Sequence, residues 1–152
     1  IRYEQLANAL KVPMGGRAPL ADVSRAVLEL RRSKGMVLDP ADHDTWSAGS
    51  FFVNPLLDLV TSAQLPPDAP RWPQVDGTVK TSAAWLIEHA GFARGYGTGQ
   101  ARLSSKHALA ITNRGRATTN DVLALAREIR SGVRDRFRVD LVPEPILVGC
   151  DL

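Results

Sequence analysis

Apolar residues recur every three to four positions in five segments of the chain, which is the spacing of one buried helix face. The clearest pattern begins at Thr119 or Asn120 and continues to Val133, with charged residues on the other side. The pair Asn54-Pro55 predicts another helix start, because Asn is a common N-cap and Pro fits the first helical position. The expected helices span residues 3–10, 20–32, 55–63, 82–90 and 119–133.

Alternating apolar and polar positions predict a few short strands. One is expected over 106–112, a second over 137–141, and a third in the apolar run 146–148 that follows Pro143. Four prolines make 66–73 an extended loop. The mixture predicts an α+β fold, in which helices pack on a small, mainly antiparallel sheet.

The charge and the predicted secondary structure of the chain change near residue 37. A basic, helical stretch gives way there to an acidic, loop-like one that begins at Asp39. We therefore predict two parts, 1–37 and 38–152. The sequence opens at Ile1 without an initiator Met, a signal peptide or a transit peptide. It is expected to begin inside a longer protein.

Composition narrows the class of protein. With 152 residues, 44% apolar and 23% charged, the chain is typical of a globular domain. No run of 18 apolar residues predicts a membrane span. The single cysteine, Cys150, excludes a disulfide framework and favours a reducing compartment, the cytoplasm.

Charge is unevenly distributed along the chain. The net charge is only +3, but residues 94–138 carry ten basic and three acidic side chains, a local net charge of +7. Such a stretch calls for an anionic partner: nucleic acid, a phosphorylated small molecule or a membrane surface.

Common catalytic and binding motifs are incomplete. The glycines of 95–99 lack the third glycine of a dinucleotide fingerprint and follow a predicted helix instead of a strand. Asp42-His43-Asp44 has no second cluster to complete a metal site, so we predict no metal and interpret these residues as a solvated loop. Ser50 lacks the Gly-x-Ser-x-Gly context of a hydrolase nucleophile.

Two segments nevertheless suggest chemistry. Residues 47–55 combine small residues, the hydroxyl of Ser50 and two aromatic side chains, and Gly49 would let another molecule approach that hydroxyl. Glu144 lies between two prolines and apolar neighbours, so we expect it to be held rigidly and partly desolvated. Desolvation raises the pKa of a carboxyl group and would make Glu144 a possible proton donor.

These segments carry a resemblance to a known family. Residues 47–55 read Ser-Ala-Gly-Ser-Phe-Phe-Val-Asn-Pro, and with eight other blocks they resemble the C-terminal half of the UDP-N-acetylenolpyruvoylglucosamine reductases. Those other blocks cover nearly the whole chain in order: 31–37, 73–80, 84–88, 106–109, Asn113, 117–118, 121–122 and 143–144.

The resemblance implies a set of site residues. Ser50 would be the general acid that protonates an enolate-like intermediate, and Glu144 would stabilise or protonate that intermediate. The family's catalytic arginine lies in the flavin-binding half and has no counterpart here. Five side chains are implied to lie near the UDP-sugar: Lys34, Asn54, Trp72, Arg94 and His107.

Four positions depart from the family pattern. Trp72 stands where some members have Tyr, and His107 where some have Gln. Val53 replaces a residue that is often basic, and Arg94 replaces Lys, which keeps the charge but changes its geometry.

The resemblance also implies cofactors and partners. FAD would be bound mainly by an N-terminal domain absent from this chain, with NADPH as co-substrate. Residues 1–37 would be the tail of that domain and its connecting helix, and 38–152 the substrate-binding domain. The chain alone is then expected to bind no FAD tightly and to be inactive. Two alternatives stay open: a basic nucleic-acid-binding module, and a UDP-sugar-binding domain without catalysis.

Overall fold

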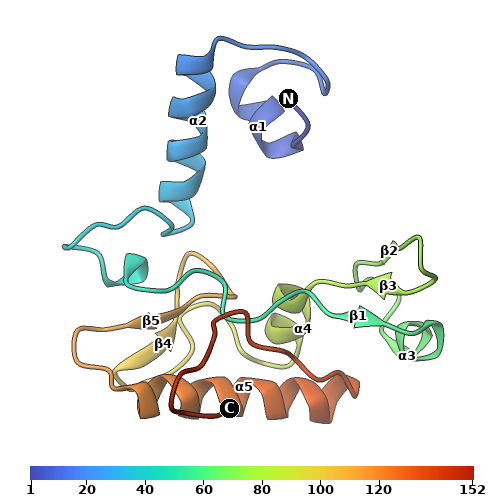
Figure 1. The fold of residues 1–152 in the computed structure, drawn as a ribbon, viewed down its shortest axis with the longest axis vertical. Coiled ribbons are helices and arrows are strands. Elements are labelled where there is room, and N and C mark those ends of the chain that lie inside the picture. Colours follow the sequence, from blue (N-terminus) through green and yellow to red (C-terminus); the bar gives the residue numbers. More distant parts are fainter.

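Helices and short antiparallel strands alternate along the chain in the computed structural model, which describes residues 1–152 (Figure 1). The helices are α1 (Glu4–Leu10), α2 (Leu20–Ser33), α3 (Leu59–Gln64), α4 (Ala83–His89) and α5 (Thr119–Phe137), with a 3-10 turn, η1 (His43–Thr45). The strands are β1 (Leu56–Leu57), β2 (Trp72–Pro73), β3 (Val79–Lys80), β4 (Ala101–Leu103) and β5 (Ile111–Asn113). The predicted α+β class is confirmed.

The strands form two separate small sheets. One has the order β1-β3-β2, and the other is the antiparallel pair β4-β5. Leu56 and Trp72 both pair with Lys80, so the three side chains lie in one row across the first sheet. Isolated bridges join Ser50 to Ala110 and Phe52 to Pro143, which attach the 50–52 segment to two later loops.

The core lies between α4, α5 and the β4-β5 pair. α5 runs beneath the other elements (Figure 1), and its buried face matches the predicted helical repeat. The helix starts at Thr119, one of the two predicted starts, and Thr118 before it forms a reciprocal capping box with Asp121. Several core side chains are fully buried, among them Phe52, Leu86, Ile87, Leu103 and Ile129.

The first two helices form a pair that stands apart from the remaining elements (Figure 1). They pack mainly on each other, and only Ala7 and Ala26 are buried. Leu20 and Leu28 stay exposed on their surface. α2 ends, as predicted, before Gly35, which adopts a left-handed φ of 68°. The boundary between 1–37 and 38–152 stays a prediction.

The predicted helix over 55–63 is right only in its second half, and its start at Asn54-Pro55 is wrong. The chain forms β1 there, and α3 starts at Leu59 with Asp58 as the N-cap, whose carboxylate accepts the Thr61 N–H at 2.7 Å. Asn54 serves a different helix instead, because its Oδ1 accepts the N–H of Ala83 at the start of α4. The sequence pattern showed a capping residue but not which helix it caps.

The strand predictions were only partly right. Within 106–112 only the end belongs to a strand, β5, and its partner β4 was missed. No strand forms over 137–141: Phe137 ends α5, and Val139 and Leu141 are buried without a ladder. Burial of alternate side chains requires only an extended segment against the core. The run 146–148 is also not a strand, and Ile146 is 91% exposed.

None of the helices combines the length and the apolar character that crossing a membrane requires.

Candidate functional site

Backbone hydrogen bonds join the two segments that carry the predicted catalytic residues. The N–H of Phe51 donates to Leu109 O at 2.8 Å, and Phe51 O accepts the N–H of Glu144 at 2.8 Å. The N–H of Val53 donates to Val142 O at 3.0 Å. The segment after Ser50 is therefore held between two loops, and one of them carries Glu144.

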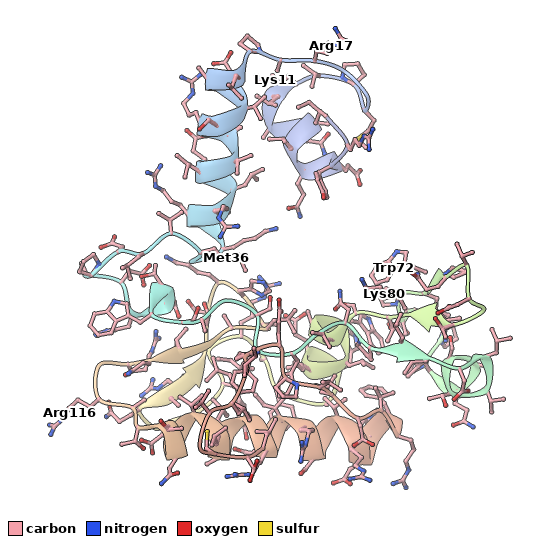
Figure 2. All side chains as sticks on the ribbon, in the orientation of Figure 1. Lys11, Arg17, Met36, Trp72, Lys80 and Arg116 are labelled. Carbon is pink, nitrogen blue, oxygen red and sulfur yellow. The ribbon has the colours of Figure 1, made fainter.

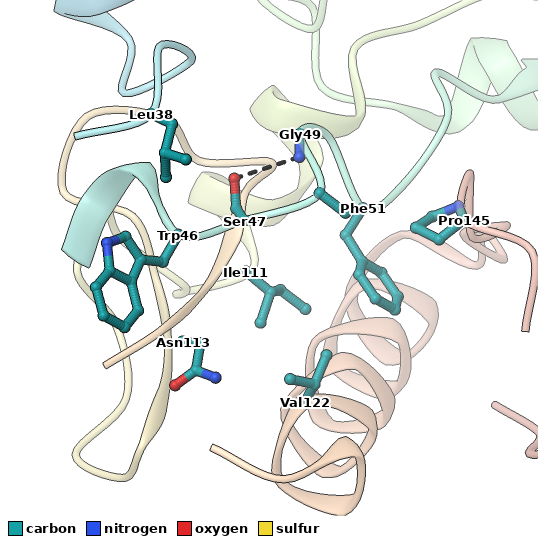
Figure 3. A pocket seen from close by; sticks show the side chains of 10 residues that line it. Leu38, Trp46, Ser47, Gly49, Phe51, Ile111, Asn113, Val122 and Pro145 are labelled. Carbon is teal, nitrogen blue, oxygen red and sulfur yellow. Dashed lines mark hydrogen bonds between the residues drawn. The ribbon is translucent and has the colours of Figure 1, made fainter. Parts of the chain in front are cut away.

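Ser50 follows a turn that requires glycine. Gly49 has a φ of 88°, which a residue with a Cβ rarely adopts, and its N–H donates to Ser47 Oγ at 3.3 Å (Figure 3). Ser50 itself is half-buried. Its backbone is fixed on one side by this turn and on the other by the Phe51 hydrogen bonds.

The expected desolvation of Glu144 is wrong for this chain. Its side chain is exposed, although its backbone is tied to Phe51. The neighbouring Val142 and Ile146 are exposed as well, at 57% and 91%. The prolines that flank Glu144 keep the backbone extended, but nothing in residues 1–152 covers the carboxylate.

Three of the predicted substrate-binding residues, Lys34, Arg94 and His107, lie near enough for the two cations to act on the His107 ring, and we call them the cationic cluster. Burial lowers the pKa of His107 most, and the positive charges of Lys34 and Arg94 lower it further, while Glu88 acts in the opposite direction. These residues come from the end of α2, from α4 and the loop after it, and from the loop before β5. The fold therefore brings together charges that lie far apart in the sequence.

Hydrogen bonds orient the side chains of the cationic cluster. Arg94 Nε donates to Glu88 Oε1 at 3.0 Å, and Lys34 Nζ donates to Gln5 Oε1 at 2.7 Å. His107 Nδ1 accepts the N–H of Leu109 at 3.1 Å, so in the neutral ring the proton lies on Nε2. The cluster offers two cations and one neutral N–H donor, which suits a phosphorylated ligand.

A pH titration tests the environment of His107. Its folded-state pKa lies below the ordinary 6.5, so on acidification below about 6.5 the unfolded chain takes up the proton first. As the pH is lowered from about 6.5, the free energy of unfolding therefore decreases, and this decrease stops below the folded-state pKa of His107. We expect His107→Gln to remove this part of the loss, as measured by urea unfolding at pH 7.5 and 5.5.

Arg94→Gln is the control for that titration. It keeps His107 but removes one of the two nearby cations. We therefore expect the free energy of unfolding to decrease between pH 7.5 and 5.5 by an amount between those of the wild type and His107→Gln. Equal losses in all three proteins would contradict the lowered pKa.

Asn54 and Trp72 have different positions. Asn54 is exposed, and because Oδ1 is bound to Ala83, its Nδ2 is left facing solvent as a donor. Trp72 is 48% exposed on the hairpin of β2 and β3 beside Lys80 (Figure 2). Figure 2 shows this hairpin well apart from Met36, near the end of α2. Trp72 thus lies away from the end of α2, and no hydrogen bond or ion pair joins its side chain to the cationic cluster.

The interpretation of Asp42-His43-Asp44 as a solvated loop is wrong for Asp44. This residue is only 7% exposed, and its carboxylate is bound to Ser105 and Arg114. These contacts could not be predicted from local sequence patterns, because the partners lie more than sixty positions away.

A hollow of about 530 Å³ lies beside the segment that precedes Ser50 (Figure 3). Its lining is mostly apolar and contains no Lys or Arg. The hollow therefore offers no cation to the pyrophosphate of a flavin dinucleotide. Ten residues line it: Leu38, Trp46, Ser47, Ala48, Gly49, Phe51, Ile111, Asn113, Val122 and Pro145.

Comparison with known proteins decides the family. The sequence model of the UDP-N-acetylenolpyruvoylglucosamine reductase C-terminal domain matches residues 39–148. The chain belongs to this family. The matched range includes both predicted catalytic residues and every predicted substrate-binding residue except Lys34.

The relatives of this reductase family are longer proteins. The UDP-N-acetylenolpyruvoylglucosamine reductases of Thermobifida fusca and Streptomyces avermitilis are 58% and 56% identical to the chain over its full length. The chain covers 46% and 44% of these two relatives, slightly less than half of each. The solved reductase (MurB) of Thermus caldophilus is 25% identical, with a TM-score of 0.43 over 83% of this chain and 35% of its own.

Proposed function

We propose that the chain is the substrate-binding and proton-donating part of a flavoenzyme of peptidoglycan synthesis in the cytoplasm. The full-length protein would reduce UDP-N-acetylglucosamine enolpyruvate to UDP-N-acetylmuramate. One observation carries the proposal: in a member of this family, backbone hydrogen bonds hold the Ser50 and Glu144 segments together.

The cationic cluster accounts for recognition of the UDP group. Lys34 and Arg94 would neutralise the diphosphate, and the Nε2–H of His107 would add a directed hydrogen bond. An ion pair with Glu88, 3.0 Å from Arg94 Nε to Glu88 Oε1, orients Arg94. Asn54 can donate from Nδ2 while its oxygen stays bound to Ala83. Trp72 offers an exposed aromatic face for stacking, though from a separate hairpin.

Ser50 would supply the proton of the reaction. FAD, when bound to the full-length protein, would supply the hydride chemistry from NADPH, and residues of that protein outside 1–152 would hold the FAD. Hydride addition leaves a carbanion stabilised by the neighbouring carboxylate, and the Ser50 hydroxyl would donate its proton to that carbon. Glu144 would lie across from it, and water would return a proton to Ser50.

The hollow near Ser50 offers no Lys or Arg to the pyrophosphate of FAD. We therefore expect the 152-residue chain to bind no FAD tightly and to have no activity by itself. Copurifying flavin absorbance would contradict this expectation.

Binding of UDP to the full-length protein tests the proposed recognition. Lys34→Gln should weaken binding about tenfold, since a charge-assisted contact to phosphate is lost. Arg116→Gln is the matched control, an exposed cation in the turn before α5 (Figure 2), and should change the dissociation constant less than twofold. Isothermal titration calorimetry measures both.

The same experiment separates the two classes of anionic partner. A wild-type protein that ignores UDP but binds duplex DNA in a salt-dependent manner would favour the nucleic-acid alternative. Two arginines of α5 already have partners within the chain: Arg127 donates to Asp151 O, and Arg134 pairs with Asp140 at 3.3 Å.

A further inference from the structure

Asp44 is a buried carboxylate with no direct part in the proposed reaction. Its side chain is 9% exposed and accepts three hydrogen bonds. The N–H of Ser105 lies at 3.1 Å and Nη1 of Arg114 at 3.0 Å, and the Ser105 hydroxyl is the third donor. Both oxygens are therefore fixed from the loop before β5 and from the turn after it.

This carboxylate holds the loop that carries His107. Ser105 lies two residues before His107, and its backbone N–H and its hydroxyl both bind Asp44. The intervening residue, Lys106, forms an ion pair with Asp42 in the same acidic turn. The loop thus has three polar attachments to residues 42–44.

At the Lys34 end of the cluster, the backbone of Gly35 passes close to the backbone oxygen of Asp44. A Cβ on Gly35 would lie 2.7 Å from Asp44 O, and Gly35 also has a φ of 68°. Only glycine allows the chain leaving α2 to pass this close. Because Gly35 directly follows Lys34, the backbone at Lys34 lies close to that of Asp44.

The contacts of Asp44 are energetically demanding to break. Burial by itself raises the pKa of the carboxyl group, but the hydrogen bonds from Ser105 and the charge of Arg114 outweigh it and hold the pKa below its ordinary value. Asp44 is thus ionised at neutral pH, and release of a partner would leave a buried charge unsatisfied.

We propose that Asp44 is a positioning residue that sets the spacing between Lys34 and His107, and thereby the affinity for the diphosphate of the substrate. The inference rests on the proposed function, because it concerns the same cationic cluster. Asp44 would touch no substrate atom. Its effect would pass through Ser105 on one side and Gly35 on the other.

The test compares two isosteric changes in the full-length protein. Asp44→Asn should weaken UDP binding and raise KM for the UDP-sugar about tenfold, and leave the rate of flavin reduction by NADPH unchanged. Asp121→Asn is the matched control, since Asp121 also accepts a backbone N–H and a hydroxyl, both from Thr118. It should lower the thermal midpoint without changing UDP affinity.

A second pair of variants keeps the test decisive if Asp44→Asn does not fold. Ser105→Ala removes only the hydroxyl contact and should weaken UDP binding about threefold, and Ser105→Thr should restore it. UDP affinity within twofold of wild type in Asp44→Asn, or in Ser105→Ala when the first variant is unfolded, would overturn the inference. A wild-type protein that does not bind UDP would instead overturn the proposed function, and the inference with it.

Discussion

Ser50→Ala in the full-length protein is expected to leave flavin reduction by NADPH at the wild-type rate and to slow reoxidation by the enolpyruvyl substrate about a thousandfold. That factor lies within the range of a lost general acid. Anaerobic stopped-flow absorbance of the flavin measures the two half-reactions separately. The effect should fall only on the second, because the proton is needed only after the hydride has been transferred.

The structure indicates that this substitution removes the hydroxyl and leaves the backbone unchanged. The Gly49 turn and the two hydrogen bonds of the Phe51 backbone hold residue 50 whatever its side chain. Alanine therefore removes the hydroxyl without moving the chain. UDP affinity and the thermal midpoint should stay at the wild-type values.

Ser47→Ala is the matched control for that prediction. Its hydroxyl lies in the same segment but accepts only the N–H of Gly49, at 3.3 Å, within the turn (Figure 3). We expect both half-reactions to change less than threefold. Normal reoxidation in Ser50→Ala would remove Ser50 from the mechanism.

Helices could be predicted from the sequence where local signals agree. For α5 the apolar repeat and the polar residues at the predicted start, Thr119 and Asn120, indicate the same element, although the helix continues four residues beyond the predicted end. Ser82 likewise caps α4, accepting the N–H of Trp85 at 3.2 Å. The α3 region failed because Asn54-Pro55 imitates a helix start, whereas its amide oxygen binds a residue 29 positions later.

Strands were harder to predict because each has only two or three residues. No periodicity can be recognised over so short a length, and pairing depends on contacts distant in sequence. Val139 and Leu141 show the opposite error, since they alternate and are buried but make no ladder. Burial alone produced that pattern.

The candidate site was predictable mainly through the family resemblance. Residue patterns alone suggested Ser50 and Glu144, but not that Phe51 links their segments. They also missed Asp44, because the local sequence of an acidic loop is the same whether its carboxylate is buried or exposed in the folded chain. Its burial depends on Ser105 and Arg114, whose positions only the folded chain defines.

Phe52→Ala is expected to lower the free energy of unfolding by about 3–5 kcal/mol, the usual loss for a buried Phe truncated to Ala. Phe52 is 1% exposed, and its ring meets that of Phe51 edge to face at a centroid distance of 5.1 Å. Total stability of a domain is only about 5–15 kcal/mol, so this one change removes a large part of it. Urea unfolding of the 152-residue chain gives the value.

Val53→Ala, at the next position, separates packing from a general sensitivity of the segment. Val53 is 38% exposed, so it should lose less than about 1 kcal/mol. Both changes keep the backbone groups that bind the loops at Leu109 and Val142. A difference between the two variants therefore measures burial of the Phe52 ring, and equal small losses would show that this ring does not anchor the Ser50 segment to the core. A large loss confined to Phe52→Ala would mean that the segment carrying the proposed proton donor is held by core packing as well as by its hydrogen bonds.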